Sequence, residues 1–436
     1  MTADAQSPGW SYYLQKQVLV IFLLGFSAGL PFALVYSTLT AWLETAAIDR
    51  STISTFAWLG FAYSFKVVWA PIIDSARIPM LTNWLGRRRA WMLVAQLSIG
   101  VALLMLSGMN PATDIKMFAI VAFAVAFSSA TQDIIVDAYR IECAEIRMQG
   151  VLAAAYQYGY RVALIFSMGG ALILSDYFSW GVVYQIMAMM MVIGLLATLW
   201  ADEPEVRTEQ FKAPAGSILK KTTAWFAHAV AEPFGDFVTR FGQFAIVLIV
   251  FVSLYRISDY VLGILANPFY LDIGYTGTQI GLIAKTYGAW VTIVGIALGG
   301  WTVVKYGVAR CLVTATVLIA ATNLFFAVMV IVGPEEWMLA VTITADNIAQ
   351  GFGGTVLIAY LSSLVNAKFT ATQYALLSSI MSLFPKFVAG YAGNVQESVG
   401  WLGFFLYAAA LGVPAIILAI YISKRHDRLV GEGPVS

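Results

Sequence analysis

The chain has 436 residues, of which 60% are hydrophobic and only 11% are charged. Soluble domains are about 45–50% apolar and about 25% charged, so this composition excludes an ordinary soluble protein. A net charge of +1, two cysteines and two histidines argue against a nucleic-acid partner, a disulfide-stapled fold and a histidine-rich metal site. The composition therefore predicts an all-α membrane protein that crosses the bilayer many times.

Twelve apolar stretches are long enough to span a bilayer as helices, which takes about 20 residues each. Their continuous apolar character favours helices over the alternating strands of a membrane barrel. The first stretch is too long for the core of a signal peptide, so we expect an uncleaved first span. In chain order the stretches cover residues 17–44, 51–74, 89–108, 113–141, 148–175, 179–201, 243–271, 277–303, 308–332, 336–365, 372–397 and 400–423.

The distribution of basic residues predicts the orientation of the chain. Twelve spans put both termini on one side, and that side collects 18 of the 25 lysines and arginines. The opposite side holds only Arg50 and Lys116, and the remaining five lie inside spans. Because cytoplasmic loops carry an excess of basic residues, both termini are expected in the cytoplasm.

The longest polar loop divides the chain into two halves. It covers residues 202–242, between an N-terminal half (1–201) and a C-terminal half (243–436) of six spans each. The second part of the loop is expected to form either an amphipathic surface helix or a simple tether. The halves also repeat: spans 2 and 8 each contain a lysine, and spans 4 and 10 contain aspartates. This organisation predicts the major facilitator fold, two six-helix halves with pseudo-two-fold symmetry and a substrate site between them.

Nine ionisable residues lie well inside the predicted spans, and they need an explanation. Each would cost about 3 kcal/mol at a lipid-facing helix centre. We therefore expect them to face the protein interior or a wet cavity, where five bases and four acids can pair. They are Lys66, Asp133, Asp137, Arg161, Arg256, Asp259, Lys285, Asp346 and Lys386.

Spacing groups some of these charges. Asp133 and Asp137 are four residues apart and share a helix face, and Lys66 is expected at a similar depth. Arg256 and Asp259 are three apart and can pair. Three roles stay open: a carboxylate that carries a coupling proton, bases that bind an anionic substrate, or pairs that only hold helices together.

Two short motifs predict packing and gating. Gly25 and Gly29 stand four residues apart in the first span, a spacing that lets another helix approach closely. The arginines of Gly86-Arg87-Arg88-Arg89 precede the third span. They anchor the topology, and they can also pair with Asp74 and control closure at the cytoplasmic face.

Several segments together make the chain similar to the AmpG muropeptide permeases of the major facilitator superfamily. They occur in the family's order and cover both halves. The segments are Gly25-Phe26-Ser27-Ala28-Gly29-Leu30-Pro31, Phe65-Lys66-Val67-Val68-Trp69-Ala70-Pro71, Gly86-Arg87-Arg88-Arg89, Ala130-Thr131-Gln132-Asp133-Ile134-Ile135-Val136-Asp137-Ala138, Gly159-Tyr160-Arg161, Lys285-Thr286 and Ala371-Thr372-Gln373-Tyr374-Ala375-Leu376-Leu377-Ser378.

The resemblance implies a proton-coupled symporter that works by alternating access. Such a permease imports anhydro-muropeptides, disaccharide-linked peptides of the cell wall, across the inner membrane of Gram-negative bacteria. Import feeds wall recycling and β-lactamase induction, and hence antibiotic resistance. Since the substrate carries several carboxylates, intramembrane bases would suit it. A related acetyl-CoA transporter branch shares the architecture, so another anionic metabolite such as an acyl-CoA-like compound is an alternative substrate.

These arguments assign roles to individual residues. For proton coupling we expect Asp133, Asp137 and Lys66. For substrate binding we expect Gln132, Tyr160, Arg161, Lys285, Asn347, Gln373 and Lys386. Arg256, Asp259 and Asp346 are expected in charge pairs, and Asp74 with Arg87, Arg88 and Arg89 in a cytoplasmic gate.

Two other classes of function fit the sequence less well than transport. A membrane sensor that binds muropeptide without moving it would normally carry a soluble domain, and no stretch here is long enough. A membrane enzyme would need a nucleophile–base pair or a metal cluster, and the sequence contains no such arrangement. We therefore expect a transporter and not an enzyme, without a cofactor, metal or nucleic-acid partner, acting as a monomer in the lipid bilayer.

Overall fold

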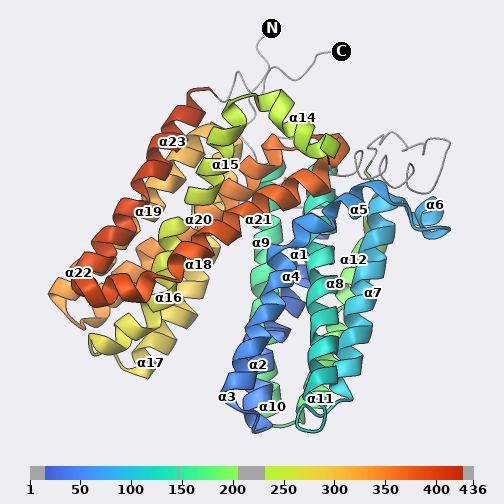
Figure 1. The fold of residues 1–436 in the computed structure, drawn as a ribbon, viewed down its shortest axis with the longest axis horizontal. Coiled ribbons are helices and arrows are strands. Elements are labelled where there is room, and N and C mark those ends of the chain that lie inside the picture. The colour runs from blue at the N-terminus through green and yellow to red at the C-terminus, as the bar shows by residue number, and fades with distance from the viewer. Residues whose placement is uncertain (1–14, 146–147, 205–230, 426–436) are drawn as a thin grey trace. The chain divides into compact units, whose positions relative to one another are not determined.

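The structure is a computed structural model that describes residues 15–145, 148–204 and 231–425. Every regular element in these ranges is a helix, and the helices form two compact units (Figure 1). The N-terminal unit comprises Trp10–Gly235 and also Val365–Leu376, whereas the C-terminal unit contains Asp236–Leu364 and Leu377–Ser436. Most of the predicted linker, residues 205–230, lies outside the described residues.

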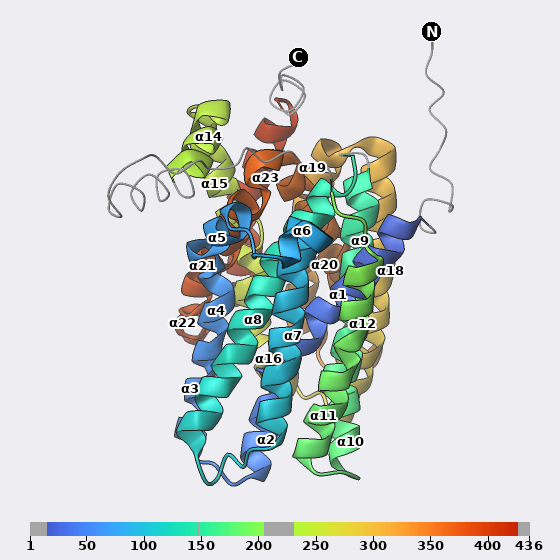
Figure 2. The same cartoon turned by 90° about the vertical axis from the view of Figure 1, so that its right-hand side faces the viewer.

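The helices of the N-terminal unit follow the predicted spans. In Figure 2, α7 and α8 of this unit run side by side, and they pack against each other. The elements are α1 (Lys16–Leu34), α2 (Ser37–Thr45), α3 (Arg50–Thr55), η2 (Phe56–Leu59), α4 (Gly60–Ser64), η3 (Lys66–Val68), α5 (Ala70–Ser75), α6 (Leu81–Leu85), α7 (Arg87–Ser107), α8 (Ile115–Glu142), α9 (Gln149–Leu164), η5 (Ile165–Gly170), α10 (Ala171–Ser175), α11 (Trp180–Met190), α12 (Val192–Trp200) and η8 (Ala367–Phe369).

The remaining helices belong to the C-terminal unit, except that α14 and α21 each contain a boundary between the units. They are α14 (Glu232–Phe241), α15 (Phe244–Leu254), α16 (Ile257–Asp272), α17 (Gly277–Gln279), η7 (Ile280–Tyr287), α18 (Gly288–Tyr306), α19 (Val308–Val332), α20 (Glu336–Leu364), α21 (Thr370–Ala389), α22 (Ala392–Leu411) and α23 (Val413–Ser423).

Within the described part of the chain, nine helices are long and apolar enough to cross a membrane, and α20 with η8–α21 qualifies as one bent pair. The stretch predicted as the second span is helical but broken into five short pieces from α3 to α5. Pro71 lies in the first turn of the last piece, a position that tolerates proline because the N–H there has no partner within the helix. All twelve predicted stretches fall on helical segments, which confirms the all-α membrane class.

Small residues let α1 and α9 pack very closely in the N-terminal unit. A Cβ atom on Gly29 would lie 2.6 Å from the Tyr160 carbonyl oxygen, and one on Gly159 would lie 2.7 Å from the Phe26 nitrogen. Gly25 faces the Tyr156 backbone in the same way. The close packing predicted from Gly25 and Gly29 is therefore confirmed, with Gly159 as the complementary residue on α9.

Replacing Gly159 with valine is expected to separate α1 from α9 and to destabilise the folded protein by about 1–3 kcal/mol or more, the usual cost of overpacking. Gly100 on α7 is the matched control, because a Cβ there meets no atom within 4 Å. Thermal unfolding in detergent measures the effect. Equal stability of Gly159→Val and Gly100→Val would contradict the close α1–α9 contact.

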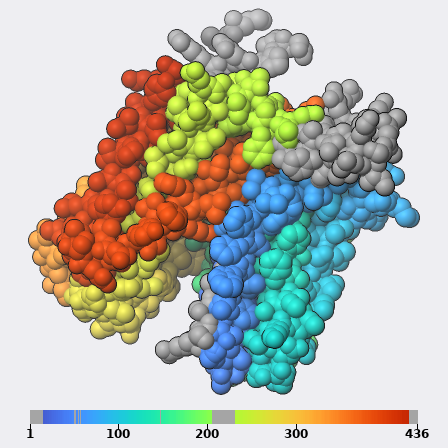
Figure 3. Space-filling model, in the orientation of Figure 1, coloured from blue at the N-terminus to red at the C-terminus, as the bar shows by residue number. Residues whose placement is uncertain are grey.

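Each unit has its own aromatic core, and its outside is apolar. Trp42 packs on Phe118 and Tyr184 with ring centroids 5.0 and 4.7 Å apart in the N-terminal unit. In the C-terminal unit Phe269 and Phe405 meet edge to face at 4.5 Å. Figure 3 shows the outer side chains of α22 and α23 in red. Exposed apolar residues line these two helices, as expected where lipid and not water is the solvent.

Two spans contain π-helical segments, η5 and η7. Segments of this kind are rare and are frequent at functional sites. Arg161 lies one turn before η5, and Lys285 lies within η7. Two of the predicted substrate-binding bases therefore occur at or beside these irregular turns.

Candidate functional site

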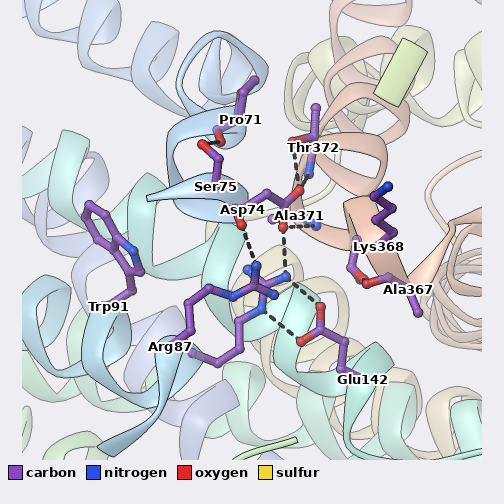
Figure 4. A network of polar contacts seen from close by, with 12 residues as sticks. Pro71, Asp74, Ser75, Arg87, Trp91, Glu142, Ala367, Lys368, Ala371 and Thr372 are labelled. Carbon is purple, nitrogen blue, oxygen red and sulfur yellow. Dashed lines mark hydrogen bonds and ion pairs between the residues drawn. The ribbon is translucent and has the colours of Figure 1, made fainter. Parts of the chain in front are cut away.

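Arg88 is the centre of a buried ionic network in the N-terminal unit. Its Nη2 lies 2.7 Å from Asp74 Oδ1 and 2.5 Å from Glu142 Oε1, and its Nε donates to Glu142 Oε2 at 2.9 Å. Only 1% of the Arg88 side chain is exposed. Figure 4 shows Asp74 and Glu142 converging from α5 and the end of α8. The paired charges compensate each other where water cannot.

The other face of Asp74 caps a helix. Its Oδ2 accepts hydrogen bonds from the Thr372 backbone N–H and hydroxyl, both at 2.7 Å, and Oδ1 accepts from the Ala371 N–H at 3.2 Å (Figure 4). These N–H groups belong to the first turn of α21, where backbone N–H groups have no acceptor within their own helix. The carboxylate therefore satisfies the start of α21 and opposes its partial positive charge.

The neighbouring arginines tie together the ends of α7 and α12. Glu203 accepts from the backbone N–H groups of Arg88 and Arg89 at 2.8 and 3.1 Å. Arg89 in turn donates to the carbonyls of Thr198 and Leu199 at 3.0 and 2.8 Å. Arg87 donates to the Asp74 carbonyl. All four predicted gate residues thus share one network.

Asp137 on α8 stands between two cations. Its carboxylate oxygens lie 3.6 Å from Lys66 Nζ and 3.5 Å from Arg140 Nη2, and all three side chains are buried. Arg140 also donates to Gln149 Oε1 at 3.2 Å and covers the Tyr374 ring at 5.4 Å. The predicted Lys66–Asp137 contact is present, and Asp137 is a fully compensated carboxylate.

Asp133 lies one turn earlier on the same helix in a different environment. Its Oδ1 is buried and has no hydrogen-bond partner among the described residues. Lys66 and Asp137 are the charges that act on it. Gln132 points elsewhere: it is fully buried and its Oε1 accepts from the Ser27 hydroxyl at 3.2 Å. Asp133 is therefore the less constrained of the two carboxylates.

Tyr160 belongs to an aromatic group beside Asp133. Its ring centroid lies 6.1 Å from those of Phe32 and Tyr156, and Phe32 lies 5.4 Å from Tyr63. Asp133 acts electrostatically on the hydroxyls of Tyr63, Tyr156 and Tyr160. Rings with polar edges next to a carboxylate can hold an amphipathic ligand such as a sugar.

The C-terminal unit has a polar cluster of its own. Arg256 Nε donates to Asp259 Oδ2 at 3.2 Å, so the predicted pair is present. Arg256 Nη2 also donates to Gln350 Oε1 at 2.7 Å. Asp346 lies one turn before Gln350 on α20 and within electrostatic range of Asp259 and Arg256. Two helices thus bring one guanidinium and two carboxylates together.

The other predicted binding residues fall into two groups. The amides of Asn347 and Gln373 bond within the protein: Asn347 accepts from the Thr292 hydroxyl at 2.7 Å, and Gln373 donates to the Pro233 carbonyl at 2.9 Å. Arg161, Lys285 and Lys386 are exposed side chains on α9, η7 and α21.

Sequence reasoning missed several members of these networks. Glu142, Glu203 and Arg140 lie at helix ends, where a charged residue ordinarily indicates nothing beyond a solvated terminus. Gln350 carries no charge and therefore no signal of membrane cost. Cys143, next to Glu142, is a free thiol, and burial raises its pKa to about 12.

Two family models match the chain. The model of the acetyl-coenzyme A transporter 1 matches residues 17–179. The model of the Major Facilitator Superfamily matches residues 248–434. The two models, both of transporter families, thus match spans in both halves of the chain.

Curated proteins match nearly the whole chain. The anhydromuropeptide permease of Escherichia coli is 32% identical over 410 residues, which are 94% of this chain and 80% of that protein. A candidate transporter named AmpG 4 from Rickettsia conorii is 33% identical over 407 residues, which are 93% of this chain and 96% of that protein.

Solved structures share the fold at low sequence identity. The proton:xylose symporter XylE has a TM-score of 0.67 at 14% identity, covering 95% of this chain and 96% of XylE. The fucose:proton symporter FucP of Escherichia coli has a TM-score of 0.69 at 12% identity, covering 94% of this chain and 99% of FucP. Likeness at this level concerns the fold alone, and it confirms the predicted major facilitator fold.

Proposed function

Because this chain belongs to the AmpG family of transporters within the major facilitator superfamily, we propose that it imports anhydro-muropeptides in symport with protons. The observation that carries the substrate is the 32% identity to an anhydromuropeptide permease over 94% of the chain. The chain is a multi-pass membrane transporter of a small molecule and not an enzyme. The glycopeptide, the proton and the inward direction are the proposal.

The proton is assigned to Asp133. A carrier must be able to hold and release a proton as its surroundings change. Asp137 is fixed between Lys66 and Arg140, whereas Asp133 Oδ1 is buried without a hydrogen-bond partner among the described residues. Lys66 then tunes the pair, and the neighbouring Tyr160 group would contact the sugar part of the substrate.

The network of Asp74 with Arg87, Arg88 and Arg89 is proposed as a gate for alternating access. It supports this role because Asp74 bonds both a cation and the start of α21, so the same residue links two elements that a transport cycle could separate. The protein would act as a monomer in the bacterial inner membrane, with both termini in the cytoplasm as the basic residues indicate.

Uptake into proteoliposomes tests the proposed function. Purified protein is reconstituted and given labelled GlcNAc–anhydroMurNAc–tripeptide, with and without an inward proton gradient. Accumulation that collapses when the gradient is dissipated is the expected result. Binding without uptake would instead favour the sensor, and neither binding nor uptake by folded protein would remove the substrate proposal.

A second substrate class has one specific observation in its favour. The acetyl-coenzyme A transporter model matches residues 17–179, which include the Asp133–Asp137 helix. An acyl-CoA-like anion is therefore the competitor to include. Excess acetyl-CoA that leaves muropeptide uptake unchanged, and is not itself taken up, would exclude this alternative.

A further inference from the structure

A cleft of about 310 Å³ opens in the C-terminal unit beside the polar cluster of α16 and α20. Its lining consists of Arg256, Asp259, Tyr260, Gly263, Ile264 and Gln350. The four lining residues from α16, Asp259, Tyr260, Gly263 and Ile264, follow helical spacing and so share one face. The volume is at the small end of ligand pockets, so it suits one end of a large substrate and not the whole.

The cleft lies beside a break in the seventh span, and Arg256 at this break is one of its lining residues. α15 ends at Leu254 and α16 begins at Ile257, because Arg256 adopts a non-helical conformation with φ −109° and ψ 14°. Interrupted helices of this kind form binding sites in many transporters, since the break turns polar groups inward. Here the break aims Arg256 across to Gln350 on α20.

The charges around the cleft are unequal in number and in exposure. Among the described residues of the cluster, Arg256 is the one cation and Asp259 and Asp346 are both carboxylates, so these three carry one excess negative charge when all are ionised. The Arg256 side chain is 30% exposed, whereas that of Asp259 is only 7% exposed. A guanidinium thus faces the open space and carboxylates lie behind it. Gln350 is within hydrogen-bonding reach of both carboxylates.

This arrangement selects among ligand chemistries. A simple anion would satisfy Arg256 but would leave a buried carboxylate without compensation, which is costly. A neutral sugar would pair with neither the guanidinium nor the carboxylates. A group with a carboxylate and an ammonium on the same end matches both, because each charge then gains a charge-assisted hydrogen bond.

We propose that the cleft is a subsite for the zwitterionic end of the substrate's peptide. The peptide carboxylate pairs with Arg256, and its ammonium pairs with Asp259. Asp346 lies behind the lining and adds its negative charge to that of Asp259. Tyr260 and Ile264 contact the aliphatic part, and Gly263 leaves room for it. This assignment rests on the proposed function, because it requires a peptide-bearing substrate.

Gly263 offers a test that removes no charge. A Cβ built there meets no atom within 4 Å, so the first atom of a new side chain is tolerated, and Gly263→Phe is expected to place its ring in the cleft. Gly393 on α22 is the matched control, since its Cβ also meets nothing within 4 Å and it does not line the cleft. Equal thermal stability of the two variants shows that the fold is kept.

Three substrates are compared in proteoliposomes: the disaccharide without peptide, a muropeptide whose last residue has a free amino group and a free carboxylate, and that muropeptide with the amino group acetylated. Gly263→Phe is expected to raise the KM for the zwitterionic muropeptide about tenfold, because the ring keeps the peptide end from Arg256 and so costs one strong charged contact. Uptake of the bare disaccharide should stay within about twofold of wild type, as should all uptake by Gly393→Phe.

Asp346→Asn is the second variant, and it tests the excess negative charge that favours the ammonium. It is expected to erase the preference of the wild type for the free over the acetylated amino group. Equal losses for the disaccharide and the muropeptide, or no preference in the wild type, would overturn the subsite while leaving muropeptide transport intact. A wild type that moves none of the three substrates would instead remove the proposed function itself.

Discussion

Replacing Arg88 with methionine is expected to destabilise the protein by about 3–5 kcal/mol, the cost of removing one partner from a buried ionic pair. The change removes the cation that ion-pairs with Glu142, whose side chain is 1% exposed, next to the buried carboxylate of Asp74. Among the described residues Arg87 remains within electrostatic range of both carboxylates. Two like charges then share a dry site. The stability of Arg88→Lys should lie between those of the wild type and Arg88→Met, because lysine keeps the charge but loses the forked hydrogen bonds to Glu142. Chemical or thermal unfolding in detergent measures the series.

Lys16 and Asp202 provide the matched control for burial. Their ion pair is 2.6 Å long, nearly the same as the Arg88–Glu142 distance of 2.5 Å, but the side chains are 41% and 74% exposed. Exposed pairs contribute about 0–1 kcal/mol, so Lys16→Met should change stability little. A similar loss in both variants would show that burial is not what gives the Arg88 network its importance.

Asp133→Asn is expected to abolish proton-driven accumulation without abolishing movement of the substrate. With the membrane potential clamped, a gradient of one pH unit supplies about 1.36 kcal/mol per proton, so wild-type one-proton symport can concentrate substrate about tenfold. The variant should reach the same final level with and without the gradient. Substrate counterflow, which needs no net proton movement, should persist.

Asp137→Asn separates coupling from structure. Asp137 compensates both Lys66 and Arg140, so its loss leaves two buried cations close together and should lower the unfolding temperature. Asp133→Asn breaks no ion pair of this kind and should unfold near the wild-type temperature. If Asp133→Asn still accumulates substrate against its gradient, Asp133 is not the carrier and Asp137 becomes the candidate.

The helices were predictable from the sequence because one effect, the burial of apolar side chains in the bilayer, determines membrane spans. A helix that crosses the bilayer needs about 20 consecutive apolar residues, and such runs can be recognised in the sequence alone. The second span shows the limit: its apolar length is correct, but five short helices replace one because local backbone geometry around Lys66 and Pro71 overrides the average.

The site residues that could be predicted are charged residues inside spans, because a charge in the bilayer has a high free-energy cost. Asp137 with Lys66, and Arg256 with Asp259, are in contact as the spacing and depth suggested. Glu142 and Gln350 could not be found in this way, since a terminal acid and a neutral amide cost little in a span. Glu142 and Gln350 become important only through the packing of α7 on α8 and of α16 beside α20. These tertiary contacts cannot be read from a single sequence.

The π segments η5 and η7 have a consequence for comparing this chain with others. Each residue of an α-helix advances the side chains by about 100° and the axis by about 1.5 Å, and a π turn accommodates one residue more. A deletion of one residue in Ile165–Gly170 or Ile280–Tyr287 would restore a regular helix while shortening the span by a negligible length. Homologues can therefore gain or lose single residues at these two places, and alignments across them should be judged by helical phase as well as by identity.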